Sequence, residues 1–301
     1  MTRALHPPPG LGPVLALVMN AFVWGVSWWP FRQLQGMGLH PLWATSIIYV
    51  LSALAIGLWR PGAWSLLRTN PALWLILLAS GTTNAAFNWA VSIGDVVRVV
   101  LLFYLMPVWA LFLARVVLHE RMTRDATLRV LLALAGAVLV LWPAESRFGA
   151  AAFSLPDALA LLGGFAFALN NVMLRRSAAI PQEGRALAMF LGGASVAGTA
   201  AALLSSGVAG AAIGVAWPAA SLAWPLPVLG LALAFLCANL CLQYGASRLP
   251  ATVTAVVMPC EVLFAALTAV WWGGETLHAT VLVGGALILS ATLLSLVKLR
   301  S

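Results

Sequence analysis

Residues 96–118 read VVRVVLLFYLMPVWALFLARVVL, an apolar stretch whose only charged residues are Arg98 and Arg115. An α-helix rises 1.5 Å per residue, so about 20 residues cross the roughly 30 Å of hydrocarbon in a bilayer. The stretch therefore predicts a membrane-spanning helix. Pro107 lies deep within it and removes one backbone hydrogen bond, which favours a bend at that level.

Apolar stretches of similar length lie on both sides of residues 96–118 and fill most of the chain. The 301 residues are 62% hydrophobic and 8% charged, with a mean hydropathy of +1.00. About a quarter of the residues in a soluble domain are charged, so this composition is that of a membrane protein. The ten expected spans are 11–34, 41–59, 71–91, 96–118, 125–142, 156–174, 184–206, 225–244, 251–272 and 277–297.

Polar landmarks of the first five spans recur in the second five. Asn84, Asn88, Trp89 and Glu120 correspond to Asn239, Gln243, Tyr244 and Glu275, each 155 positions later. Because each half holds an odd number of spans, the second half must lie upside down in the bilayer. An inverted duplication with a site between its halves is typical of secondary transporters. The sequence therefore predicts an all-α integral membrane protein of ten transmembrane helices. Its first five-helix repeat occupies 1–147 and its inverted repeat 148–301, as one transport unit.

The distribution of positive charge predicts an orientation. The formal net charge is +8, but the basic residues are spread over short loops, which does not favour nucleic-acid binding. If the N-terminus is cytoplasmic, thirteen of the sixteen Lys and Arg lie on that side, and only Arg32, Arg98 and Arg147 lie outside. Excess positive charge in cytoplasmic loops sets the orientation of membrane proteins. We therefore expect both termini in the cytoplasm.

Glu261 is the most costly side chain in the sequence, because it lies near the midpoint of the expected span 251–272. A charged carboxylate in mid-bilayer costs about 3 kcal/mol or more, so such a group faces a cavity or a partner. We expect it to bind a substrate ammonium group or to carry a proton. The alternative is a buried, protonated acid that bonds a neighbouring helix. No second acid or His lies at similar depth to complete a proton relay, which favours the ligand role.

Carboxamides form a second group of candidates for substrate binding. Asn84 and Asn88 share one helix face, and Asn239 and Gln243 share another. An amide both donates and accepts, so it suits a zwitterion. The alternative is interhelical hydrogen bonding of about 0.6 kcal/mol each. Asn171 is also a candidate, although only one of it and its neighbour in the chain can point inward.

Aromatic side chains are the third group. Trp24, Tyr104 and Phe167 could provide flat apolar walls for a ligand, with a few polar groups to orient it. Trp24 and Phe167 are favoured because they occupy nearly equivalent places in the two halves. The alternative for each of them is ordinary packing in the core or against lipid.

Neither an enzyme, a cofactor nor a metal site is expected. The four His lie at helix ends or in loops, and no nucleotide-binding loop or catalytic Gly-x-Ser-x-Gly motif occurs. The three Cys are Cys237, Cys241 and Cys260, all within expected spans and without a His or Asp cluster beside them. We interpret them as small packing residues, forming neither disulfides nor a metal site.

Several motifs resemble a known family. Trp24-Gly25-Val26-Ser27 resembles the Trp-Gly-Ser signature of the drug/metabolite transporter superfamily, EamA type. Pro107 with Glu120, and Gly274-Glu275 in the second half, resemble its helix ends, and 284–288 resembles its last helix. Two shorter motifs, 48–52 and 104–107, resemble the YddG-type branch of aromatic amino acid exporters.

The resemblance implies an exporter of amino acids, with a preference for aromatic ones, that works by alternating access in the bacterial inner membrane. It implies a small-molecule substrate and a lipid bilayer as partners, and a monomer is expected. The alternative within the family is export of another small metabolite or drug. A membrane enzyme or a structural subunit is the alternative from another class, and a subunit would not need Glu261 or the amides.

Overall fold

The computed structural model describes residues 11–117, 124–141, 153–207, 215–246, 257 and 260–297. Within those ranges the regular structure is helical and no strand occurs. The helices are α1 (Leu11–Val26), α2 (Trp28–Gly36), α3 (Pro41–Trp59), α4 (Gly62–Thr69), α5 (Ala72–Ile93), α6 (Val96–Phe103), α7 (Met106–Val117), α8 (Arg124–Leu141), α9 (Leu155–Arg176), α10 (Gln182–Ser205), α11 (Pro225–Ala246), α13 (Cys260–Gly273) and α14 (Ala279–Val297).

Among the described residues, six helical segments are long and apolar enough to cross a membrane. They are Leu11–Gly36, Pro41–Trp59, Val96–Val117, Leu155–Leu174, Gln182–Ser205 and Pro225–Leu242. The described parts of α13 and α14 are apolar but shorter. α5 is less apolar because it contains Asn84 and Asn88, and α8 begins with the charged pair Arg124 and Asp125. The chain is therefore an all-α membrane protein.

Two of the expected spans are each divided into two helices, and a proline follows each break. α1 ends before Ser27, whose N–H bonds the Trp24 carbonyl at 3.2 Å in a tighter turn. Pro30 has no N–H for the carbonyl four residues earlier. In the same way, α6 ends before Tyr104, and Pro107 cannot bond the Phe103 carbonyl. The expected bend at Pro107 is thus a break between two helices.

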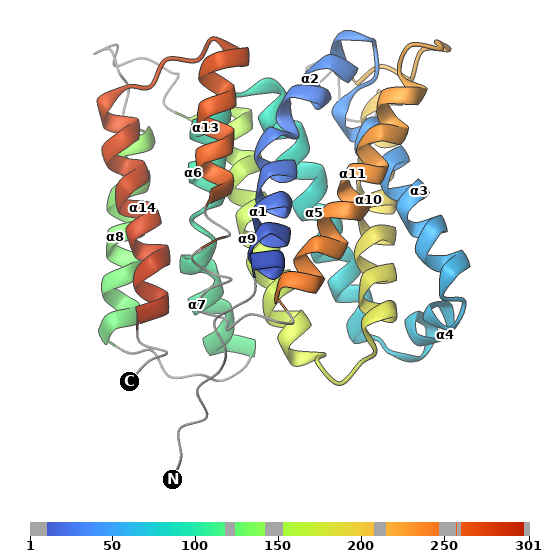
Figure 1. Cartoon of the computed structure of the whole chain (residues 1–301), viewed down its shortest axis with the longest axis horizontal. Helices are drawn as coiled ribbons and strands as arrows, with labels where there is room; N and C mark the ends of the chain where they lie inside the picture. Colours follow the sequence, from blue (N-terminus) through green and yellow to red (C-terminus); the bar gives the residue numbers. More distant parts are fainter. Residues whose placement is uncertain are drawn as a thin grey trace.

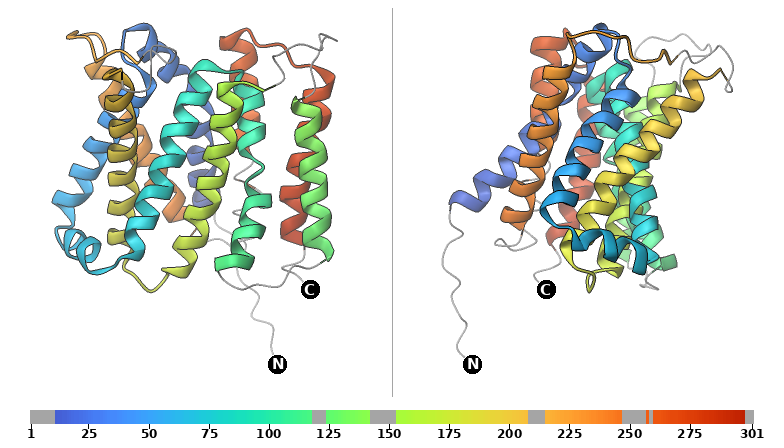
Figure 2. Two further views of the ribbon diagram at one scale, coloured as in Figure 1. Left: turned by 180° about the vertical axis from the view of Figure 1, so that it is seen from behind. Right: turned by 90° about the vertical axis from the view of Figure 1, so that its right-hand side faces the viewer.

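The helices form one bundle in which helices distant in sequence lie side by side (Figures 1 and 2). α5 packs on α9 and α10, while α1 packs on α11 and α13. α3 packs on α10 towards one edge, and α8 pairs with α14 at the other. Glycine permits the closest approaches, since a Cβ on Gly192 would overlap the Leu77 carbonyl of α5. The bundle is therefore held by interdigitated helix faces.

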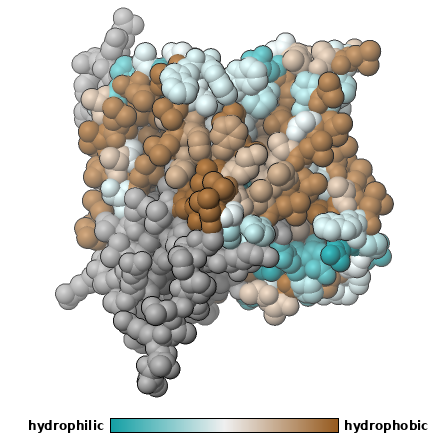
Figure 3. All heavy atoms as spheres, in the orientation of Figure 1, coloured by the Kyte–Doolittle hydropathy of each residue, from teal (hydrophilic) through white to brown (hydrophobic). Residues whose placement is uncertain are grey.

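The bundle has two ends, which we call the α2 end and the α4 end after the short helices there (Figure 1). α4 was not among the expected elements because it is too short to cross a bilayer. It buries Ala63 and Leu67 and leaves Trp64 and Arg68 exposed, as in a helix lying on a membrane surface. On the face that Figure 3 shows, the described surface between the ends is largely apolar, which suits contact with lipid.

Candidate functional site

Tyr104 and Glu261 meet inside the bundle, from opposite halves of the chain. Tyr104 lies in the break between α6 and α7, and its hydroxyl donates to Glu261 Oε2 at 3.3 Å. Glu261 is in the first turn of the described part of α13, which begins about midway between the two ends (Figure 1). The residues that would make Glu261 the midpoint of a longer helix lie outside the described ranges. The pair occupies the depth at which a transporter binds its substrate.

Gly25 brings α1 against this pair. A Cβ at Gly25 would lie 2.7 Å from the Glu261 carbonyl oxygen and 2.8 Å from Phe264 Cβ. Real Cβ contacts are longer than this, so a larger residue at position 25 would push α1 away from α13. The glycine of the Trp24–Ser27 motif therefore has a physical role, which is to set the spacing of two helices beside the acid.

Aromatic rings pack next to Tyr104. Phe103 contacts Phe87 of α5 with ring centroids 4.8 Å apart and Phe167 of α9 with centroids 5.4 Å apart. Phe167 is only partly buried. The structure thus brings three of the expected site residues, Tyr104, Phe167 and Glu261, into one region.

Glu261 has no basic partner in the part of the chain that the structure describes. The two ion pairs of the described residues join Arg32 to Glu275 and Arg98 to Asp157. Among the described residues, the hydrogen bond from Tyr104 is the polar contact of the Glu261 side chain. An acid with a hydroxyl partner and an aromatic surround can accept a hydrogen bond from a ligand ammonium group.

Trp24 and Asn84 lie in a second cluster, between α1, α3, α5 and α11. Trp24 stacks on Phe235 with ring centroids 4.6 Å apart. The Tyr49 hydroxyl donates to Asn84 Oδ1, and Asn84 Nδ2 donates to the Ser80 carbonyl at 2.8 Å. Both polar groups of this amide are therefore engaged within the protein, and the bond from Tyr49 of α3 is an interhelical one of the kind considered as the alternative to ligand binding.

The remaining carboxamides are distributed over several helices. Asn88 is fully buried and donates to Thr45 Oγ1 at 3.1 Å, while its Oδ1 has no partner among the described residues. Asn239 is half-buried on α11. Asn171 is exposed and its neighbour Asn170 is the inward-facing residue, 2% exposed. The side chain of Gln243 lies outside the described part.

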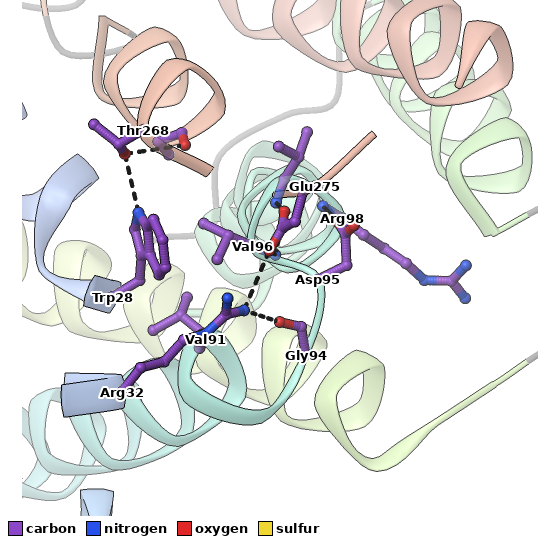
Figure 4. Close-up of polar contacts among 11 residues, drawn as sticks. Trp28, Arg32, Val91, Gly94, Asp95, Val96, Arg98, Thr268 and Glu275 are labelled. Carbon is purple, nitrogen blue, oxygen red and sulfur yellow. Dashed lines mark hydrogen bonds and ion pairs between the residues drawn. The ribbon is translucent and has the colours of Figure 1, made fainter. Parts of the chain in front are cut away.

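A network at the α2 end was only partly expected from the sequence (Figure 4). Arg32 of α2 donates to the carbonyls of Val91, at 3.3 Å, and Gly94, and it pairs with Glu275 at 3.2 Å. Trp28 Nε1 donates to Thr268 Oγ1 at 3.0 Å, and the Arg32 guanidinium lies 4.7 Å from the Trp28 ring centroid. α2 is thereby joined to α5 and to the second half of the chain.

Glu275 is the acceptor at the centre of this network. Both of its carboxylate oxygens accept from the Val96 N–H at 3.0 Å, at the start of α6. Burial raises the pKa of Glu275 above its ordinary value and the Asp95 carboxylate acts in the same direction, although Val96 and Arg32 oppose the shift. The partners of Glu275 could not be read from the sequence, because Arg32 lies 243 positions away.

The second ion pair of the α2 end joins α6 to α9. Arg98 Nε lies 2.8 Å from Asp157 Oδ1, and Arg98 Nη2 lies 3.0 Å from Oδ2. Asp157 also accepts from the Ser154 N–H at 2.9 Å and from the Ser154 hydroxyl at 2.8 Å, which holds Ser154 against the first turn of α9. Arg98 therefore meets a carboxylate instead of extending to the membrane surface.

No group of three potential metal ligands occurs in the described ranges. The chemistry that these residues offer is non-covalent: one acid, one hydroxyl and several aromatic rings at mid-depth, and hydrogen-bonded ion pairs near one end. Such an arrangement can bind a small molecule and can join or separate helices.

Comparisons with known proteins find a family likeness in the first half of the chain. Residues 11–142 match the EamA-like transporter family. An uncharacterised transporter of Pseudomonas aeruginosa is 28% identical over 138 residues, which cover 44% of this chain and 46% of that protein. The match thus spans about half the length of this curated relative.

A solved structure extends the likeness to the whole fold. A crystal structure described only as that of a protein aligns with 96% of this chain and 97% of its own, with a TM-score of 0.59 and 18% identity. At that identity it shows a shared fold alone. Taken with the helical membrane architecture and the motifs at Trp24–Ser27 and Pro107, the family match supports one statement: residues 11–142 resemble the EamA-like transporter family.

Proposed function

We propose that this protein is a secondary transporter that exports small amine-bearing metabolites, preferably aromatic amino acids, across the bacterial inner membrane by alternating access. The observation that carries the proposal is the meeting of Glu261 and Tyr104 at mid-depth, beside a partly buried Phe167 and without a basic partner among the described residues. The EamA match supports the transport class. The acid and the aromatic rings support the substrate class.

Ten membrane-crossing helices in two inverted repeats are part of this proposal, and helix packing supports it. The packing of α1 on α11 corresponds to that of α9 on α5, and the packing of α1 on α13 corresponds to that of α9 on α7. Likewise the packing of α5 on α10 corresponds to that of α11 on α3. Three further contacts each join a helix to its equivalent in the other half, namely α3 with α10, α6 with α13 and α8 with α14. A two-fold relation in the membrane plane requires this reciprocity.

Charge at the two ends supports cytoplasmic termini. The described cations of the α2 end, Arg32 and Arg98, are both paired with acids, whereas Arg60 and Arg68 at the α4 end are exposed. α14 ends at the α4 end, and α1 begins on the same side of the bundle (Figure 1). An excess of unpaired positive charge belongs on the cytoplasmic side. The α2 end would then face the periplasm.

In this mechanism Glu261 is the ligand of the substrate ammonium group. An ionised acceptor makes a shorter and stronger hydrogen bond than a neutral one. Tyr104 holds the carboxylate in place, and Phe103 and Phe167 offer flat surfaces for the substrate side chain. Asn84 has both polar groups engaged, so we assign it to the packing of α3 against α5. Substrate binding by Asn239, Gln243 and Asn171 stays a prediction.

A second candidate is export of lipophilic organic cations. The same observation favours it, because an acid in an aromatic surround without a described basic group also suits a drug-like cation. The two candidates differ in whether the substrate has a carboxylate. An amino acid needs a hydrogen-bond donor in the protein for its carboxylate, whereas a simple amine has no such group.

Flux through purified protein in liposomes tests the proposal. The panel should contain labelled Phe, Trp, Met and Thr, the decarboxylated amines of Phe and Trp, and a quaternary aromatic cation. Saturable flux of Phe and Trp, absent from protein-free liposomes, is the expected result. Flux of the amines and cations alone would transfer the assignment to the second candidate, and flux confined to sugars or nucleotides would contradict both.

A further inference from the structure

We infer that Glu275 closes the α2 end of the transport path by tying α2 and the start of α6 to the connection between α13 and α14. This inference deepens the proposed function and rests on it for its role in transport. The closure itself depends on the contacts that Glu275 makes with Arg32 and with the backbone of α6. Glu275 is a positioning residue, because it acts through these partners.

The first step is that Glu275 joins segments from both halves of the chain. Its carboxylate receives the guanidinium of Arg32, 3.2 Å away on α2, and the N–H of Val96 at the start of α6. The Glu275 backbone N–H donates to the Ala269 carbonyl at 3.1 Å, which holds the residue against the end of α13. One side chain therefore fixes the relative position of three segments (Figure 4).

The second step is that the surrounding side chains leave little open surface when these contacts form. Trp28, Phe31 and Leu34 of α2 are each at most 2% exposed. Trp28 adds its own bond to Thr268 of α13, 3.0 Å long. The same face of α2 thus carries a buried apolar surface and a polar bond to the opposite half, which is what closure at one end of a transporter requires.

The third step is that the contacts can be exchanged for water. The side chains of Arg32 and Glu275 are 26% and 11% exposed, so the pair lies at the rim of the protein and not in its core. Every donor and acceptor in the network could be hydrated if α2 moved away. A buried ion pair deep in the core would have no such second state.

The fourth step is that Glu275 does more than form an ion pair, because its carboxylate also binds the N-terminus of α6. The N-terminus of α6 carries a partial positive charge and free N–H groups, which a carboxylate satisfies and a guanidinium cannot. Exchanging the charges of Arg32 and Glu275 would restore an ion pair but would place a cation at the α6 N-terminus. The exchange should therefore fail to restore closure.

The test measures access of a thiol reagent to Ser92→Cys in full-length protein in which Cys237, Cys241 and Cys260 are changed to Ala. Ser92 is 7% exposed and lies between Val91 and Gly94, whose carbonyls accept from Arg32. The exchange of an oxygen for a sulfur changes the packing little. The reagent is a membrane-impermeant maleimide, and its rate of reaction is compared among variants in liposomes.

Glu275→Gln should raise the labelling rate about tenfold or more, because charge-assisted bonds to one side chain are lost. Glu183→Gln, the same change in the first turn of α10 at the α4 end, is the matched control and should label at the parent rate. Arg32→Lys should give an intermediate rate, since a lysine keeps the charge but cannot reach all three acceptors at once. The double exchange Arg32→Glu with Glu275→Arg should label as fast as Glu275→Gln.

A parent labelling rate in Glu275→Gln would overturn the inference, as would a parent rate in the double exchange. If Glu275→Gln is not recovered as folded protein, the rate for Arg32→Lys decides, and a parent rate there overturns the inference too. Amine flux by the parent is measured in the same liposomes. Absence of flux would remove the proposed function, while the labelling rates would still decide whether Glu275 closes this end.

Discussion

The indole nitrogen of Trp28 donates a hydrogen bond to the hydroxyl of Thr268, 3.0 Å away and 240 positions later in the chain. Thr268 in turn donates to the Phe264 carbonyl at 2.7 Å, so the bond continues into α13. Trp28 is 2% exposed, and no water can replace Thr268 without movement of α2.

Thr268→Val should therefore lower stability, because the valine has the same shape but leaves the buried Trp28 N–H without an acceptor. The cost of such an unsatisfied donor is about 1–3 kcal/mol. A fall in the midpoint of thermal unfolding in detergent is the measurement. Thr69→Val, at an exposed position of α4, makes the same exchange and should leave the midpoint nearly unchanged.

Glu261→Gln should weaken transport of amine-bearing substrates while the fold is retained, because the amide keeps the hydrogen bond from Tyr104 but not the charge. Loss of a charge-assisted bond corresponds to a rise in KM of about 10-fold to 100-fold. Concentration-dependent uptake into liposomes measures it. An unchanged KM would identify Glu261 as a structural acid, and the loss of uphill flux alone would identify it as a proton carrier.

Phe167→Leu should reduce the preference for aromatic over aliphatic substrates more than Trp24→Leu does. Both rings are partly buried, but Phe167 packs on Phe103, the neighbour of Tyr104 in the chain, whereas Trp24 is stacked on Phe235 in the other cluster. An aromatic pair contributes about 0.5–1.5 kcal/mol beyond its buried area, so the change in preference should be up to about tenfold. The ratio of Phe to Met flux reports it. A larger effect at Trp24 would return that residue to the substrate site.

His40 should make stability depend on pH. Burial lowers its pKa from 6.5 to about 4, and the neutral ring caps α3 by accepting from the Leu42 N–H at 3.2 Å. A pKa below that of the unfolded chain means stability that is present above pH 6.5 and lost as the pH falls toward 4. His40→Asn keeps a capping acceptor without the titration, so its melting temperature should fall less between about pH 7 and pH 5.

The sequence predicts the helices well because each needs about 20 apolar residues to cross a bilayer. The breaks at Ser27 and Tyr104 are only partly visible in it. Pro107 indicated the second, but Pro30 lies near the end of its apolar stretch and gave no separate signal. Where the chain carries a short helix with one buried face, as at Gly62–Thr69, hydropathy alone does not distinguish it from a loop.

The candidate site was predictable where it contains a residue that is energetically costly to place inside a membrane. Glu261 stands out because an acid at depth must have a reason to be there. Its partner Tyr104 was proposed as an aromatic wall, and its role as a hydrogen-bond donor required coordinates. Which of two adjacent amides points inward depends on helix rotation, so the choice of Asn171 over Asn170 could not be made from composition.

The two ion pairs at the α2 end also constrain how the protein is made. The partner of Arg32 is residue 275, so during synthesis at about 5–20 residues per second it emerges about 12–50 s after Arg32. Asp157 follows Arg98 by only 59 residues. Throughout the longer interval the guanidinium of Arg32 has only the Val91 and Gly94 carbonyls and solvent as acceptors. The first half must therefore remain in the membrane with this end incomplete until nearly the whole chain has left the ribosome.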